Sequence, residues 1–158
     1  MSIEKATSCY GFSPLMKLTL QRILMVEDDL DIQVVARLSL EAVGGYTVEI
    51  CSGGSEALRK ISAFAPDLVL LDVMMPDMDG PTVLQCLRDF EPTRELPVVF
   101  ITARAQAHEI ASYLQMGALG VVSKPFDPME LPATLAGFWQ QNRWRETMRS
   151  NAVYQDKK

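Results

Sequence analysis

Short apolar runs alternate with segments of helical periodicity along this chain, and this alternation limits its fold more than any other feature. Three of the runs are apolar throughout, at 23–26, 68–71 and 98–101. Two more, at 47–51 and 120–123, are alternating or short. Strands that are separated by helices pair in parallel, because a parallel pair needs a long crossover between its strands. The pattern therefore predicts an α/β fold, in which helices cover both faces of a five-stranded parallel sheet in doubly wound (βα)5 order.

The composition of each run predicts its place in the sheet. A strand that helices cover on both faces is apolar along its whole length, so the three continuous runs are predicted to be central. The runs at 47–51 and 120–123 are predicted to be edge strands. Apolar residues at helical spacing predict the helices, and these are Leu30, Val34, Leu38 and Ala42; Ala57, Leu58, Ile61 and Phe64; Val83, Leu84 and Leu87; Ala107, Ile110, Ala111 and Leu114; and Leu131, Leu135, Phe138 and Trp139.

The last helix is predicted to begin near Asp127, which can cap it, with Pro128 in its first turn. Pro132 is then awkward, because its missing N–H falls just beyond the turn whose N–H groups are free. We therefore expect a distorted start to this helix.

The length of 158 residues fits one domain of ordinary size. We expect that domain over 21–142, an N-terminal extension over 1–20, and over 143–158 either a continuation of the last helix or a disordered tail. Output domains usually exceed about 50 residues. The short stretch after 142 therefore predicts a stand-alone protein.

Charge and cysteine content limit the partners and the compartment. The net charge is −5, and the acidic excess lies in the middle of the chain. This balance argues against broad binding to nucleic acids or anionic membranes. No apolar run reaches about 18 residues, so no membrane span is expected. Cys9, Cys51 and Cys86 have neither disulfide nor zinc spacing, which favours reduced thiols and a cytoplasmic location.

Polar residues with complementary chemistry follow four of the predicted strands. In chain order they are Glu27, Asp28 and Asp29; Asp72; Thr102 and Ala103; and Lys124. Ligands of open α/β sheets bind beyond the carboxyl ends of the strands, so these residues are predicted to meet. Carboxylates held together repel one another unless a cation joins them, and hard oxygen ligands suit Mg²⁺. A carboxylate nucleophile, a cation, an ammonium and a hydroxyl together favour phosphoryl transfer.

Two parts of this site also have simpler interpretations. The acids at 27–29, taken alone, could be an acidic helix start that the helix dipole stabilises. Thr102, taken alone, could simply end a strand. The presence of Asp72 and Lys124 at the same edge of the sheet favours the functional interpretation.

Six motifs occur in order at the predicted strand ends, namely Ile23–Asp29, Asp67–Asp72, Met74–Gly80, Ile101–Ala103, Gly117–Ala118 and Lys124–Phe126. Each is weak alone, but together and in this order they are specific. On these motifs, residues 20–142 resemble the receiver domain of two-component response regulators. The resemblance implies a flavodoxin-like strand order, 2-1-3-4-5. It also implies a signalling protein that is not a turnover enzyme and catalyses only its own phosphorylation and dephosphorylation.

The resemblance further implies the chemistry of the acidic residues. Asp72 would be the phosphoacceptor and would take its phosphoryl group from a phosphohistidine, on a sensor histidine kinase or a histidine phosphotransfer protein. Asp28, Asp72 and the backbone carbonyl of Met74 would ligate Mg²⁺. Glu27 would act on the ion mainly through water.

The remaining site residues follow from the same resemblance, with one departure from the family pattern. Thr102 and Ala103 would bind the phosphoryl group, Lys124 would form the ion pair, and the bond before Pro125 would be cis. Many receivers carry Tyr or Phe three residues before the lysine. This chain has Val121 there, so the aromatic residue that reports phosphorylation in those proteins is missing.

Three classes of function remain open from the sequence. The first is a response regulator that passes its signal by changed contacts with a downstream protein or by phosphorelay; a homodimer through the fourth helix, the last strand and the last helix would fit it. The second is an aspartyl-phosphate hydrolase, although Met74 stands where phosphatases of that kind carry a second Asp. The third is a phosphorylation-independent scaffold. The basic segment 143–158 could also dock to an acidic partner.

Overall fold

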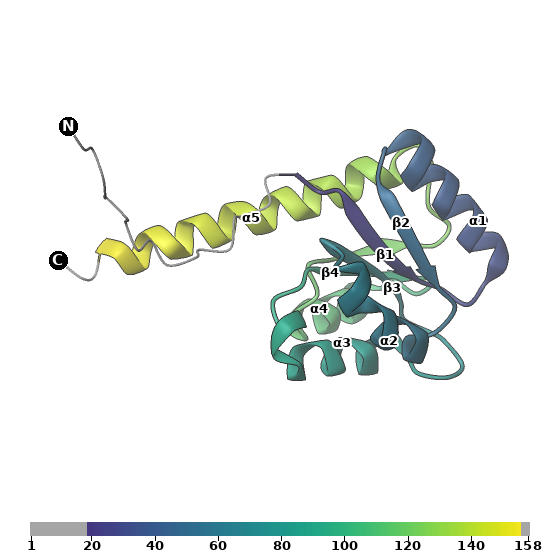
Figure 1. Cartoon of the computed structure of the whole chain (residues 1–158), viewed down its shortest axis with the longest axis horizontal. Helices are drawn as coiled ribbons and strands as arrows, with labels where there is room; N and C mark the ends of the chain where they lie inside the picture. Colours follow the sequence, from purple (N-terminus) through teal and green to yellow (C-terminus); the bar gives the residue numbers. More distant parts are fainter. Residues whose placement is uncertain (1–18, 156–158) are drawn as a thin grey trace, which may run out of the picture.

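The computed structural model describes residues 19–155, and nearly all of the predicted N-terminal extension lies outside them. The strands are β1 (Arg22–Val26), β2 (Thr47–Cys51), β3 (Leu68–Asp72), β4 (Val98–Thr102) and β5 (Gly120–Ser123). The α-helices are α1 (Leu30–Leu38), α2 (Gly54–Phe64), α3 (Gly80–Asp89), α4 (Ala107–Gln115) and α5 (Leu131–Gln155). Two short helical segments, η1 (Ser39–Val43) and η2 (Glu91–Thr93), follow α1 and α3. Figure 1 shows the arrangement.

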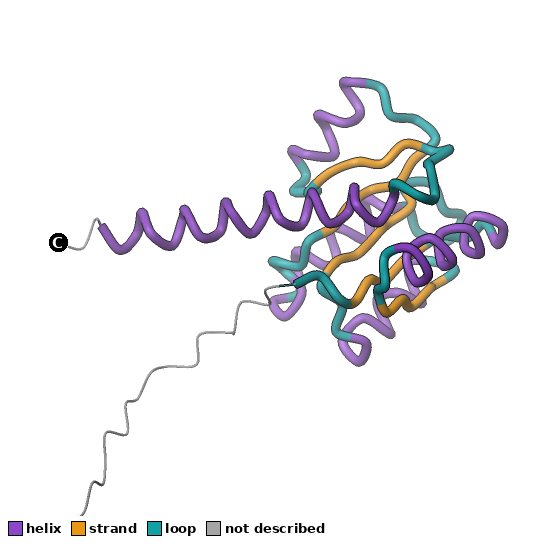
Figure 2. Tube along the Cα trace, turned by 90° about the horizontal axis from the view of Figure 1, so that it is seen from above, coloured by secondary structure: helices purple, strands orange, loops and turns teal. Residues whose placement is uncertain are grey.

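The strands form one parallel sheet in the order β2-β1-β3-β4-β5, which confirms the predicted topology. The edge strands are β2 and β5, as their composition predicted. Every residue of β3 and β4 is buried, because helices cover both faces of these central strands. In Figure 2 the strands run through the middle of the body with helices around them.

Two hydrophobic cores lie on opposite faces of the sheet. Alternate residues of a strand point to opposite faces, and β1 contributes to both cores in this way. Ile23 and Met25 pack with residues of α1, η1 and α5, whereas Leu24 and Val26 pack with residues of α2 and α3. This double burial fixes the strands, and with them the positions of the residues at their carboxyl ends.

The apolar stripe that predicted α1 faces solvent. Leu30, Val34 and Leu38 are 69%, 60% and 62% exposed. Ala36 and Leu40 are buried and pack against the sheet. Two stripes with the same helical spacing lie on this helix, and spacing alone does not indicate which of them faces the core.

Helix α5 begins at Leu131, so the predicted start near Asp127 was too early. The Asp127 side chain accepts a hydrogen bond from the Met129 N–H at 2.8 Å, and its carbonyl accepts one from the Leu131 N–H at 3.0 Å. These bonds form a turn before the helix. The Leu131 bond spans four residues, so the next helical bond would join residue 132 to the Pro128 carbonyl. Pro132 has no N–H to make it, and the Pro128 carbonyl accepts the Ser39 hydroxyl instead, so the start of α5 is distorted as expected.

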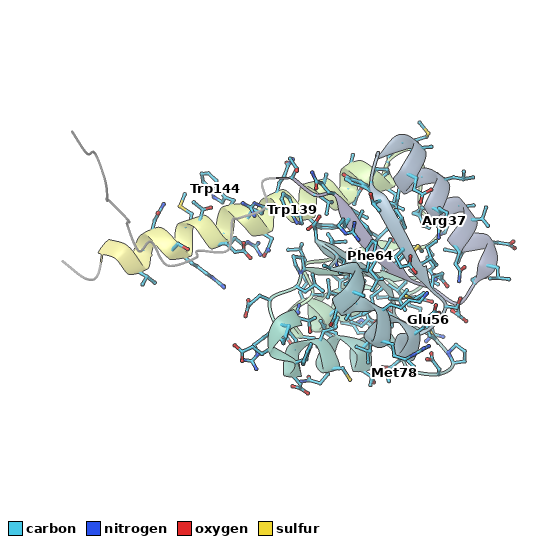
Figure 3. All side chains as sticks on the ribbon, in the orientation of Figure 1. Arg37, Glu56, Phe64, Met78, Trp139 and Trp144 are labelled. Atoms are coloured by element: carbon cyan, nitrogen blue, oxygen red, sulfur yellow. The ribbon has the colours of Figure 1, made fainter. Side chains whose placement is uncertain are left out.

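The same helix continues through 143–155 and extends away from the rest of the body (Figure 1). Trp139 is 6% exposed and belongs to the core, whereas Trp144 is 65% exposed on the extension (Figure 3). For 143–155 the structure thus shows a continuation of the last helix, which was one of the two expected outcomes. Within the part of the chain that the structure describes, no helix is both long and apolar enough to span a membrane.

Cys51, the last residue of β2, is expected to make the stability of the fold depend on pH. Its side chain is fully buried, and burial raises its thiol pKa from 9.0 to about 11. Between these values the unfolded chain loses a proton that the folded chain retains, so the free energy of unfolding falls as pH rises. We expect Cys51→Ala to flatten this fall, as measured by urea unfolding at a series of pH values from about 8 to 10. Cys86→Ala is the control, and equal slopes for wild type and Cys51→Ala would contradict the expectation.

Candidate functional site

The predicted site residues lie at the carboxyl ends of the central strands and of β5. Glu27 directly follows β1, Asp72 ends β3, Thr102 ends β4, and Lys124 directly follows β5. The Lys124 N–H donates to the Thr102 carbonyl at 2.8 Å, which ties the loop after β5 to the end of β4. Parallel strands end at the same edge of a sheet, and this is why residues so distant in sequence lie together.

An acidic cluster occupies this edge. One carboxylate oxygen from each of Glu27, Asp28 and Asp72 lies within 4.8 Å of the others. Glu27 and Asp72 are buried, whereas Asp28 is exposed. Asp29 has a different task, because its Oδ1 accepts the N–H groups of Asp31 and Ile32 and so caps α1.

Lys124 joins two of these carboxylates. Its Nζ lies 2.6 Å from Glu27 Oε2 and 3.2 Å from Asp72 Oδ1, and all three side chains are at most 15% exposed. Burial alone would lower the pKa of Lys124, but its contacts with Glu27 and Asp72 raise it above the ordinary value. Lys124 therefore stays charged and partly offsets the acidic cluster.

Glu27 is the most confined member of the cluster. Burial raises the pKa of its carboxyl, while Lys124 and the Asp29 N–H, which donates to Oε1 at 3.0 Å, act in the opposite direction. Glu27 Oε2 is buried and, among the described residues, has only the Lys124 ion pair and no hydrogen bond of good geometry. A buried carboxylate oxygen with one contact has room for a further positive partner.

The donor set fits a divalent cation. Three carboxylates against one ammonium leave the cluster with two net negative charges when all are ionised, and like charges held this close favour protonation unless a cation joins them. Oxygen ligands from carboxylates suit Mg²⁺ and Ca²⁺ rather than softer metals. Glu27, Asp28 and Asp72 could therefore hold such an ion.

The other predicted residues surround the cluster. Thr102 is buried and its Oγ1 accepts the Arg104 N–H at 3.0 Å, so its hydroxyl hydrogen is available to a ligand. Ala103 lies exposed on the loop that follows it. The Met74 N–H donates to Asp72 Oδ1 at 3.4 Å, and the Met74 side chain is 64% exposed. The Lys124–Pro125 bond is cis.

Val121 takes no part in the cluster. It is half-buried in β5 and packs against the core on the α2–α4 face of the sheet. Position 121 therefore contributes an aliphatic side chain and no ring to this face of the sheet.

Sequence reasoning missed the role of Gly80. A Cβ at this position would run into the Asp72 carbonyl oxygen and lie 2.9 Å from Val73 Cα. The Gly80 N–H also donates to the Val73 carbonyl at 2.8 Å. Only glycine allows the start of α3 to approach the end of β3 so closely. The signal was present, because glycine directly follows the helix cap Asp79, but the close neighbour is not visible in the sequence.

Sequence reasoning also missed a hollow of about 500 Å³ beside the cluster. Its walls are mainly apolar and come from α1 and from the loops after β4 and β5. They are formed by Asp31, Ile32, Val35, Ala103, Lys124, Pro125 and Phe126. No spacing pattern links these three segments, so only the fold reveals this surface.

Comparison with known proteins supports the same interpretation. The family model for the response regulator receiver domain matches residues 23–136. The chain is 37% identical over 111 residues to the response regulator Rre1 of Synechocystis sp., an alignment that covers 70% of this chain and 48% of that protein. It is 36% identical over 132 residues to the response regulator MprA of Mycobacterium ulcerans, covering 84% of this chain and 56% of MprA. The chain thus spans about half the length of these relatives.

Solved structures of receiver proteins have the same fold as this chain. The chemotaxis protein CheY4 of Vibrio cholerae superposes with a TM-score of 0.68 at 29% identity, covering 74% of this chain and 97% of that one. A CheY-like receiver domain protein of Methanospirillum hungatei gives a TM-score of 0.69 at 29% identity, covering 80% and 99%. The sheet order, the acidic cluster at its carboxyl edge and the matched family model lead to one conclusion: this chain belongs to the family of response regulator receiver domains.

Proposed function

We propose that this receiver accepts a phosphoryl group on Asp72 in a Mg²⁺-dependent reaction and signals through altered protein contacts or by relay of that group. The donor is a phosphohistidine on a histidine kinase or a histidine phosphotransfer protein. The observation that carries the proposal is the buried Asp72 carboxylate, which is clustered with Glu27 and Asp28 and contacts Lys124. Incubation of the full chain with acetyl phosphate and Mg²⁺ tests the proposal. The intact mass should increase by one phosphoryl group.

The proposed transfer forms one bond and breaks another. A carboxylate oxygen of Asp72 attacks phosphorus, the phosphorus–nitrogen bond breaks, and the imidazole leaves with the electron pair and takes up a proton. Such transfer depends mostly on positioning and charge neutralisation. Asp28, Asp72 and the Met74 carbonyl would hold Mg²⁺, with Glu27 acting through water, and the ion supplies positive charge for the phosphoryl oxygens.

Residues of the chain supply the remaining contacts. Lys124 already lies 3.2 Å from Asp72 Oδ1, so its ammonium is placed to bind an oxygen of the new acyl phosphate. The Thr102 hydroxyl retains a hydrogen that can be donated to another phosphoryl oxygen. Met74 stands where a hydrolase of the aspartyl-phosphate type would need a second Asp, so a signalling receiver fits this site better than a turnover enzyme.

Asp28 provides a test of the metal site. Asp28→Asn removes one negative ligand, so the Mg²⁺ concentration for half-maximal phosphorylation by acetyl phosphate should rise about tenfold or more, since each 1.4 kcal/mol of lost binding is a factor of about ten. Asp29→Asn is the matched control, because Asn also caps a helix well and Asp29 points to α1 rather than to the cluster. Equal Mg²⁺ dependence in Asp28→Asn and wild type would contradict the assignment.

The hollow beside the cluster fits the surface of the phosphodonor protein. Ile32, Val35 and Phe126 offer an apolar patch next to Lys124, within reach of a donor helix that carries the phosphohistidine. Val35→Lys should slow transfer from an autophosphorylated histidine kinase at least tenfold and leave acetyl phosphate labelling unchanged. The kinase for this assay is chosen beforehand, as the autophosphorylated kinase that transfers its phosphoryl group to the full chain fastest. Phe90→Lys, at an exposed apolar residue after α3, is the control, and equal kinase rates for both variants would exclude this surface.

A further inference from the structure

A second hollow lies at the opposite edge of the sheet from Asp72. Its volume is about 410 Å³. The residues before β4 and β5, including Leu96 and Leu119, line it, so it sits at the amino ends of these strands. The outer wall is α5, in the segment that continues past the body (Figure 1). We call this hollow the arginine cleft.

Positive charge predominates in the arginine cleft. Four guanidinium groups line it, from Arg88 at the end of α3, Arg94 after η2, and Arg145 and Arg149 on α5, and only two acids, Glu95 and Glu146, accompany them. The lining residues therefore carry two net positive charges, although the chain as a whole is acidic. Arg94 is also paired with Glu91, which lies outside the lining, at 3.8 Å, so the proposal below rests on Arg88, Arg145 and Arg149.

Arg88 is fixed as the inner wall of the cleft. Its guanidinium donates to the Leu96 carbonyl at 3.0 Å and to the Gly117 carbonyl at 3.1 Å. These neutral acceptors occupy two of its five N–H donors. Burial lowers the pKa of Arg88, and no carboxylate within the described residues forms an ion pair with it. Its charge is held in place, with only the longer-range attraction of Glu95 to offset it.

Arg145 and Arg149 form the outer wall. They are four residues apart on α5 and therefore neighbours on one helix face, where like charges destabilise a helix. Neither has an ion pair within residues 19–155. Glu146 forms no ion pair with either arginine, and its Oε1 instead accepts a hydrogen bond from the Asn142 amide at 3.1 Å. An anion between the two walls would relieve this repulsion.

We propose that the arginine cleft binds a small ligand that carries two or more linked phosphate groups. Guanidinium groups bind phosphate through two parallel hydrogen bonds, and the opposing walls offer such donors on both sides. A single phosphate engages one wall, whereas linked phosphates can engage Arg88 and the pair on α5 together. The volume lies within the usual range of small-molecule sites, which favours a small ligand over an acidic peptide. The ligand would hold the α5 extension to the α3 and β4 edge of the body.

Pyrophosphate is the simplest probe of this proposal. Isothermal titration of the full chain, in EDTA so that Mg²⁺ cannot link the probe to the acidic cluster, should show pyrophosphate binding at least tenfold tighter than inorganic phosphate. Affinity should fall as salt rises, because both partners are charged. Amide NMR shifts should map to Gly117, Leu119 and Arg149 and spare Asp72 and Thr102.

Arg145→Glu and Arg149→Glu should each weaken pyrophosphate binding at least tenfold, and both positions are exposed, so the fold should persist. Arg59→Glu is the matched control, because it changes an exposed arginine of α2 outside the cleft and alters net charge equally. Unchanged affinity in both cleft variants, or shifts confined to the Asp72 edge, would overturn the proposal. Binding of a glutamate-rich peptide at the cleft without pyrophosphate binding would also overturn it and would mark the cleft as a protein surface.

Discussion

Asp72→Asn is expected to abolish phosphorylation of this chain by acetyl phosphate in the presence of Mg²⁺. Wild type should gain one phosphoryl group by intact mass, and the variant none, because an amide oxygen is a poor nucleophile and Asp72 is the proposed phosphoacceptor. The variant should fold normally, since Asn has the same shape and the Lys124–Glu27 ion pair at 2.6 Å remains.

The matched control for this experiment is Asp77→Asn. Asp77 is an acid in the loop after β3, and its Oδ2 accepts the Ser55 N–H at 3.3 Å rather than joining the cluster. The Asp77→Asn variant should be phosphorylated as fully as wild type. A phosphoryl adduct on Asp72→Asn equal to that on wild type would contradict the assignment of Asp72, and so would a wild type that gains no adduct.

Lys124→Met is expected to have the largest effect on stability among the site variants. It leaves Glu27, with a side chain that is 1% exposed, without its positive partner. Removing one member of a buried ion pair costs about 3 kcal/mol in the free energy of unfolding. Urea unfolding at pH 7 without Mg²⁺ measures this loss, and adding Mg²⁺ should restore part of it because the ion supplies positive charge to the same cluster.

The loss in Lys124→Met should also depend on pH, with a defined sign. Without the ammonium the pKa of Glu27 rises further above its ordinary value of 4.5, so the folded chain retains a proton that the unfolded chain releases. Stability then falls as pH rises through this interval. The defect should be greatest at neutral pH and small below the ordinary pKa of a glutamate.

Two further variants separate this mechanism from a general loss of packing. Lys60→Met removes an exposed lysine that pairs with Glu49 and Glu56, and it should cost far less, because exposed ion pairs contribute little. Glu27→Gln in the Lys124→Met background should recover much of the lost stability, because it removes the unpaired charge. No recovery in the double variant would mean that the methylene groups of Lys124, and not its charge, stabilise the fold.

Local signals in the sequence predicted most of the fold. The continuous apolar runs of β3 and β4 and the shorter β5 indicated which strands are central and which form edges. The core side of α5 was also predictable, since Leu131, Leu135 and Trp139 all join the core. These features depend on burial along one element, which leaves a periodic trace in the sequence.

The acidic cluster was predictable for a different reason. In a parallel sheet the carboxyl ends of strands meet, so Glu27, Asp72 and Lys124 could be placed together without knowledge of any side-chain contact. Features that depend on contacts between distant segments were not predictable. They include the exposed face of α1, the contact of Gly80 with the end of β3, the hollow beside Lys124, and the arginine cleft.

Locating the phosphoryl group tests the central claim most directly. After labelling with acetyl phosphate and Mg²⁺, borohydride reduces an aspartyl phosphate to homoserine, and peptide mass spectrometry identifies the residue that changed. We expect homoserine at residue 72 alone, with no homoserine when Mg²⁺ is removed by EDTA. Homoserine at Asp28 or Asp77 in place of Asp72, or phosphate on a histidine, serine or threonine, would contradict the account.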